Sequence, residues 1–131
     1  MLEDSIADLS SAPNRIGAKA ESAAVVALQA AGYRIVERNW SIPLGELDIV
    51  ARDRDQHGRD VLVFVEVRSR DNDDHGSAAE AVTPQKRRKV TNVATFYLAI
   101  EKPVFELCRF DVVAITGGVI EIIRDAWRAT G

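Results

Sequence analysis

The spacing of apolar residues predicts a helix near the start of the chain. Its apolar positions are Ile16, Ala20, Ala23, Ala24, Ala27, Leu28 and Ala31. They recur every three to four residues, the period of a helix with one buried side. Asn14 is suited to cap the start, and Gly32 is typical of the residue that follows a helix. We therefore predict a helix over residues 15–31.

Three extended segments follow this helix. Residues 33–39 are rich in strand-forming residues, residues 46–52 follow a Pro-Leu-Gly turn, and residues 61–68 are a nearly continuous apolar run. The charged segment 52–58 indicates a hairpin loop exposed to water between the second and third strands. The pattern predicts a three-stranded meander whose third strand is the most buried.

The second half of the chain predicts another helix and two more strands. Thr83 is a favourable N-cap, and Pro84 suits the first helical position. An apolar stripe follows at Val90, Val93, Ala94, Tyr97 and Ile100. Residues 110–115 and 119–123 indicate a hairpin around two glycines. The fold class is therefore α/β, with a mixed central sheet flanked by helices.

Length and composition fit a single folded domain. The chain has 131 residues, of which 47% are apolar and 28% charged, and these values are typical of globular proteins. We expect a flexible acidic segment at 1–14, one domain at 15–124 and a C-terminal tail at 125–131. No apolar run approaches the roughly 20 residues that a bilayer requires and there is one cysteine, so we expect no membrane segment and a cytoplasmic location.

The distribution of charge is more informative than its sum. The net charge is −3, and three acids among the first eight residues account for the acidic excess, so the chain has no general basic coat. The second helix, however, opens with four basic residues at 86–89. The helix dipole disfavours cations there, which indicates an anionic partner. A solvated helix face is the other interpretation of this cluster.

Glu66 is an acid within a strand that is otherwise apolar. An uncompensated buried carboxylate costs several kcal/mol, so a cation is expected to meet it. Arg68 lies two residues further along and therefore on the same face of the strand. A buried pair of Glu66 and Arg68 that stabilises the sheet is one explanation of this pattern.

Asp48 supplies a second such acid, on the neighbouring strand. Two acids on adjacent strands repel each other, and a divalent ion removes this repulsion, because carboxylate oxygens suit Mg²⁺ or Mn²⁺. Glu21 lies seven residues before Leu28, about 20° from it around the helix, and so at the edge of the buried stripe. Glu46 is a further candidate ligand, although a solvated acid is favoured at the start of a strand.

Several short motifs occur in a fixed order along the chain. They include Ala20-Glu21, Gly32-Tyr33, Glu37-Arg-Asn-Trp40, Gly45-Glu-Leu-Asp48, Val63-Phe-Val-Glu-Val-Arg68, Ala81-Val-Thr83, Lys86 and Arg109-Phe-Asp-Val-Val113. In these residues, which cover about 15–116, the chain resembles the YraN-like family of small bacterial proteins. That family is similar to archaeal Holliday-junction resolvases and to restriction-endonuclease-like nucleases. The resemblance implies an αβββαβ core and a nuclease-like site.

The resemblance also implies a role for each acid. Asp48 and Glu66 match metal-binding acids, Glu21 matches the helix acid, and Arg68 stands where the signature has lysine. In the leading hypothesis, Asp48, Glu66 and the Val67 carbonyl hold Mg²⁺ or Mn²⁺, and Glu21 places a water or a second ion. Arginine keeps its proton in proteins, so it can bind a phosphate but cannot deprotonate water. Cleavage would then need the metal ion, or a second base, to activate the water.

Two classes of function follow, with a third less favoured. The first is metal-dependent cleavage of DNA, branched or structured DNA included, with RNA as an alternative substrate and a homodimer if both strands are cut symmetrically. Lys86, Arg87, Arg70 and Trp40 are then candidate nucleic-acid contacts, although tryptophan at a strand end is also typical of a core. The second is a non-catalytic nucleic-acid-binding protein whose acids form a structural network. The third is an interaction module that binds no nucleic acid.

Overall fold

The computed structural model describes residues 12–71 and 78–129. Most of the segment expected at 1–14 therefore lies outside the described residues. The elements are α2 (Ala12–Ala30), β1 (Arg34–Ile42), β2 (Gly45–Arg54), β3 (Asp60–Arg70), the short 3-10 helix η1 (Ala78–Ala81), α3 (Pro84–Glu101), β4 (Leu107–Thr116) and β5 (Val119–Trp127). The predicted order of helix, three strands, helix and two strands is confirmed. No helix in these ranges is long and apolar enough to cross a membrane.

The five strands form one sheet in the order β1-β2-β3-β4-β5, so β3 is central. β3 and β4 run parallel, and the other neighbours run antiparallel. A parallel pair needs a crossover connection, and α3 provides it. The sheet is therefore mixed, as predicted, with the meander β1-β2-β3 followed by a crossover.

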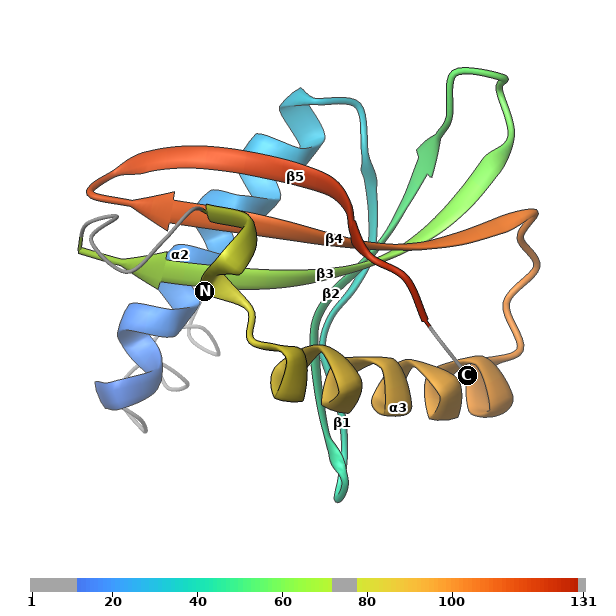
Figure 1. The fold of residues 1–131 in the computed structure, drawn as a ribbon, viewed down its shortest axis with the longest axis horizontal. Helices are drawn as coiled ribbons and strands as arrows, with labels where there is room; N and C mark the ends of the chain where they lie inside the picture. The colour runs from blue at the N-terminus through green and yellow to red at the C-terminus, as the bar shows by residue number, and fades with distance from the viewer. Residues whose placement is uncertain (1–11, 72–77, 130–131) are drawn as a thin grey trace, which may run out of the picture.

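The two helices cover opposite faces of the sheet (Figure 1). On one face, Leu28 of α2 packs among residues that include Val63 and Val65 of β3. On the other face, Tyr97 of α3 packs in a cluster that contains Phe64. Successive side chains of β3 point to opposite faces of the sheet, and a helix covers each face. Both faces of β3 are therefore buried. This explains its almost continuous apolar sequence.

Two of the predicted boundaries differ from those in the structure, and two predicted helix ends are confirmed. α2 begins at Ala12, so Asn14 lies within the helix and the expectation that it caps the start is wrong. Gly32 follows the helix with a φ of 98°, as predicted for a terminating glycine. Thr83 caps α3 by accepting a hydrogen bond at 3.2 Å from a main-chain N–H in the first turn. β5 continues past the boundary expected at residue 124 and ends at Trp127, because the indole packs in the core.

The hairpin of β1 and β2 approaches α3 closely at Gly45. A Cβ at this position would lie 2.9 Å from Cγ2 of Val93 and 3.3 Å from Cε of Lys89. Val93 is fully buried and cannot easily move away. We expect Gly45→Ala to lower the free energy of unfolding by about 1–3 kcal/mol, measured by urea denaturation, because it overpacks this contact.

Gly17 provides the matched control for this prediction. It lies in α2, and a Cβ there would meet nothing within 4 Å. Gly17→Ala should raise stability by about 0.5–1 kcal/mol, since alanine is the better helix former. If Gly45→Ala were as harmless as Gly17→Ala, the hairpin would not rest on α3 as described.

Candidate active site

The sheet divides at the middle of β2. Pairing between β2 and β3 ends at Ile49 and Val65, whereas β1 and β2 remain paired as far as Ile42 and Gly45. Beyond this point the hairpin of β1 and β2 turns away from β3 (Figure 1). We call this place the fork. The next residues on its two sides are Asp48 on β2 and Glu66 on β3, the two acids that the sequence singles out.

Asp48 is fixed at the fork by a main-chain contact. Its Oδ2 accepts a hydrogen bond of 2.9 Å from the N–H of Val67. Main-chain donors inside a protein need partners, and the ended ladder no longer provides one from the β2 backbone. The carboxylate of Asp48 takes that place, and its position is therefore set by the geometry of the sheet.

Glu66 lies against Asp48 and is only 3% exposed. Burial, together with the charge of Asp48 and a hydrogen bond between the two carboxyl groups, raises the pKa of Glu66 to about 7. Nearby cations oppose this shift without cancelling it. A buried carboxyl group whose pKa is raised by a second carboxyl group beside it is typical of functional sites, and such a pair favours a bound cation.

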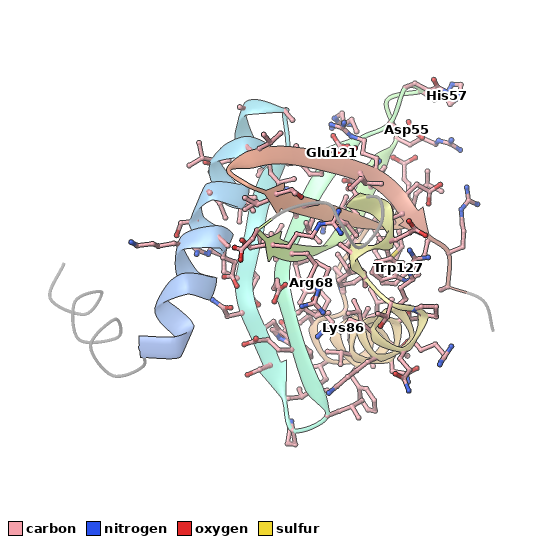
Figure 2. The ribbon with its side chains drawn as sticks, turned by 60° about the vertical axis from the view of Figure 1, so that its left-hand side comes forward. Asp55, His57, Arg68, Lys86, Glu121 and Trp127 are labelled. Carbon is pink, nitrogen blue, oxygen red and sulfur yellow. The ribbon has the colours of Figure 1, made fainter. Side chains whose placement is uncertain are left out.

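Two cationic side chains face the same oxygen of Glu66. The Nζ atom of Lys86 lies 3.7 Å from Oε2, and the Nη2 atom of Arg68 lies 3.8 Å from it. Figure 2 shows Arg68 and Lys86 close together beside the first turn of α3. The predicted common face of Glu66 and Arg68 is thus observed. The Nε atom of Arg68 is buried, and the described residues offer it no hydrogen-bond partner.

Glu21 reaches the same region from α2. The residue is 8% exposed, and burial and the charge of Asp48 raise the pKa of its carboxyl group. Arg38 lies 3.5 Å from Oε1 of Glu21 and opposes this shift. The predicted approach of a helix acid to the strand acids is therefore present, with an arginine of β1 as its partner.

Asn39 is a residue of this site that the sequence analysis does not single out. It stands across from Asp48 in the ladder of β1 and β2, has a φ of 55°, and hydrogen-bonds Glu21. Asparagine tolerates this left-handed conformation better than most residues. Asn39 is the last residue of the strand predicted at 33–39, so the sequence carries no clear signal that it belongs to the site.

The other three predicted nucleic-acid contacts have partners within the protein. Trp40 packs edge to face on Tyr97, and its Nε1 donates to a carboxylate of α3 at 3.1 Å. The Nε atom of Arg87 donates to the carbonyl of Val82 at 2.9 Å. Arg70 lies at the end of β3 and donates to Oγ1 of a β4 threonine at 3.3 Å. The structure therefore places Lys86, rather than these three, beside the acids.

A second charged cluster surrounds Asp111 of β4. Asp111 is fully buried and accepts hydrogen bonds from the Tyr33 hydroxyl at 2.6 Å, from Arg109 at 2.8 and 2.9 Å, and from the main-chain N–H of Asp125 at 2.9 Å. Arg109 also donates to Asp53 at 2.7 Å. Burial and the charge of Asp111 raise the pKa of Tyr33. Because every carboxylate oxygen has donors, this cluster is a structural network.

A cleft of about 880 Å³ lies beside this network and away from the fork. Its lining includes Asp53, Arg109 and Arg124, which pair with one another. Asp55 and His57, at the tip of the neighbouring hairpin, also line it (Figure 2). The cleft is lined by five arginines and three aspartates, and each aspartate pairs with an arginine, so it lacks the adjacent carboxyl groups that the fork offers to a metal ion.

The donors at the fork fit a hard divalent cation. Among the described residues, no three acidic, histidine or cysteine side chains form a group that could hold an ion. Mg²⁺, however, is commonly bound by only one or two carboxylates together with waters and substrate phosphates. Asp48 and Glu66 supply two carboxylates side by side, and the charge of Asp48 helps to raise the pKa of Glu66, an effect that a bound cation would oppose.

Comparison with known proteins places these residues within one family. Residues 20–115 match the uncharacterised protein family UPF0102. The chain belongs to this family. The matched range contains Glu21, Asp48, Glu66 and Arg68, and the expected membership of the YraN-like family is thus confirmed.

Curated UPF0102 proteins from distant bacteria are similar over most of their length. The chain is 42% identical to one from Lachnoclostridium phytofermentans over 116 residues, covering 88% of this chain and 94% of that protein. It is 41% identical to one from Syntrophus aciditrophicus, covering 86% and 88%, and 41% identical to one from Dictyoglomus thermophilum, covering 76% and 80%. The similarity therefore extends over most of the chain, and the family match at residues 20–115 includes the fork.

Proposed function

We propose that this UPF0102 protein is a divalent-metal-dependent nuclease that hydrolyses phosphodiester bonds in DNA, branched or structured DNA included. The observation that supports the proposal is the fork, where Glu66 is buried against Asp48 and faces Arg68 and Lys86. Paired carboxylates beside side-chain cations suit a metal ion and a phosphate at once. Membership of UPF0102 itself names no activity.

Each side chain at the fork has a distinct task in this proposal. Asp48, Glu66 and the Val67 carbonyl hold Mg²⁺ or Mn²⁺, and the ion supplies positive charge next to the phosphate when it is bound. Arg68 is half-exposed at the fork and binds a non-bridging phosphate oxygen. Glu21 accepts a hydrogen bond from the attacking water and so orients it.

The reaction is an in-line displacement at phosphorus. The water oxygen forms a new bond to phosphorus while the bond from phosphorus to the sugar oxygen breaks. One proton of the water passes to solvent, and the departing sugar oxygen takes up a proton to become an alcohol. The products are a phosphate monoester and an alcohol, and the cationic side chains at the fork stabilise the negative charge that develops on the phosphate oxygens.

Metal binding and cleavage test the proposal together. We expect Mn²⁺ to bind wild-type protein in calorimetry and to support nicking of branched or linear DNA that a chelator stops. Asp48→Asn should lose both, with cleavage falling at least about 1,000-fold, because it removes one of two carboxylates at the fork. Glu121→Gln is the matched control, since Glu121 is an exposed acid of the edge strand β5, which β4 separates from β3 (Figure 2), and it should behave as wild type.

Other outcomes would separate the remaining functions. Unchanged metal binding and cleavage in Asp48→Asn would contradict the proposal. DNA binding that falls with salt but ignores chelators, without cleavage, would favour a non-catalytic nucleic-acid-binding protein. Parallel assays on single-stranded, branched and RNA substrates determine the preferred nucleic acid, and symmetric cutting of both strands would indicate a homodimer.

A further inference from the structure

We infer that Lys86, which α3 delivers to the fork, is a catalytic residue that contacts the phosphate under attack and takes the place of the lysine that β3 lacks. The inference rests on the proposed function and deepens it. The observation that carries it is the position of the Lys86 Nζ atom, 3.7 Å from Glu66 Oε2 and thus as close to that oxygen as the Arg68 guanidinium at 3.8 Å. Either cation can therefore meet a phosphate held at Glu66.

The main chain of Lys86 is held firmly by the start of α3. Its N–H donates to Oγ1 of Thr83 at 3.2 Å, and Thr83 O accepts the N–H of Arg87 at 2.9 Å. Pro84 fixes φ at the first helical position. A rigid first turn limits where the ammonium can lie, and such fixed positions are what a catalytic group requires.

The helix dipole gives no reason for a lysine at this position. Cations near a helix N-terminus interact unfavourably with the helix dipole, and α3 has no acidic residue in its first turn. The side chain nevertheless extends from the helix toward the sheet and remains 34% exposed. This leaves the ammonium accessible to a ligand while it faces the buried acid.

Lys86 and Arg68 suit different parts of the reaction. The guanidinium of Arg68 is planar, has several donors, and binds a phosphate in one fixed orientation. The ammonium of Lys86 is a compact charge whose donors can follow a phosphate oxygen as that oxygen gains charge. In this division Arg68 contributes to binding, and Lys86 stabilises the transition state while keeping its proton.

The test compares Lys86→Met with Lys89→Met. Lys89 lies one turn further along α3 and is exposed. We expect Lys86→Met to lower the kcat of metal-dependent DNA cleavage about 100- to 1,000-fold, with KM changed less than about threefold. Lys89→Met should keep kcat and at most weaken binding with a smaller salt dependence. Thermal unfolding of each variant confirms that it is folded.

A rescue experiment gives a readout that a structural role would not produce. Arg68→Lys added to Lys86→Met should restore kcat at least about tenfold, because it returns an ammonium to the fork from the strand side. Lys86→Arg should keep more activity than Lys86→Met, since it retains the charge.

The outcomes distinguish this inference from the proposed function. If the wild-type protein cleaves DNA and Lys86→Met raises KM with kcat unchanged, Lys86 is a binding residue and the inference is overturned. Equal kcat in Lys86→Met and in the double variant also overturns it. Absence of cleavage by wild-type protein with either Mg²⁺ or Mn²⁺ overturns the proposed function and the inference with it.

Discussion

Glu66→Gln is expected to make the protein more stable while it removes metal-dependent cleavage. Glutamine keeps the shape of the protonated acid, but it cannot carry the charge that burial and Asp48 disfavour. We expect the free energy of unfolding at pH 8, without metal, to rise by about 1–3 kcal/mol. Cleavage should fall at least about 1,000-fold, because a carboxylate of the fork is lost.

The sign of this change in stability follows from how the free energy of unfolding depends on pH. The pKa of Glu66 is raised from 4.5 to about 7 in the folded protein, so between these values the folded state binds more protons than the unfolded state. Stability should therefore decrease as pH rises through this window and level off above it. Glu66→Gln should remove that decrease, and urea unfolding at pH 5, 6, 7 and 8 measures it.

Addition of Mn²⁺ supplies the control for this prediction. At pH 8 the ion should stabilise wild-type protein, because ligands that bind only the folded state do so, and it should leave Glu66→Gln unaffected. If Glu66→Gln instead lowered stability at pH 8, Glu66 would be a charged partner that Arg68 and Lys86 stabilise. The acid would then belong to a structural network.

Asp111→Asn should be the most destabilising of the conservative substitutions considered. Both oxygens of the buried Asp111 carboxylate accept hydrogen bonds, and the donors include Tyr33 and Arg109. An amide places its own N–H₂ group against one of these donors and leaves Arg109 short of a counter-charge. We expect a loss of about 3–5 kcal/mol in the free energy of unfolding, measured by urea denaturation.

Asp60→Asn is the matched control for Asp111→Asn. Asp60 pairs with Arg52 at 2.9 Å, but its side chain is 38% exposed, so the loss should stay below about 1 kcal/mol. Below its unfolding temperature, Asp111→Asn should keep the kcat of the wild type, since Asp111 makes no described contact with the fork residues. If Asp111→Asn lowered the free energy of unfolding no more than Asp60→Asn does, the network around Asp111 would contribute little to stability.

The clusters around Glu66 and Asp111 show how much an acid within an apolar strand predicts about the role of that acid. Glu66 and Asp111 give the same signal, an acid within a β-strand with an arginine two residues away. At Asp111 the arginine donates at 2.8 Å and every oxygen is satisfied, whereas at Glu66 the arginine stays 3.8 Å away. Sequence spacing places the two groups on one face, but side-chain geometry decides whether the pair is structural or open to a ligand.

The order of elements was predictable because periodicity and caps are local signals. The apolar run of β3 and the cap at Thr83 are examples. The fork was not predictable, because the end of the ladder between β2 and β3 depends on how the hairpin rests on α3 near Gly45. The same holds for Asn39, which follows from tertiary packing rather than from its neighbours in sequence.

Asp48 is both a hydrogen-bond acceptor and a negative charge, and a single base change in its codon can remove the charge while an acceptor remains. One oxygen satisfies the Val67 N–H where the sheet divides, and the negative charge is what a metal ion would require. Asparagine preserves an acceptor for that N–H but has no charge, and the codons for aspartate and asparagine differ only in their first base. Under the proposed function, a descendant that keeps the fold and the cations of the fork but has lost cleavage lies one mutational step away, so a nuclease and a non-catalytic nucleic-acid-binding protein would differ by one base at this position.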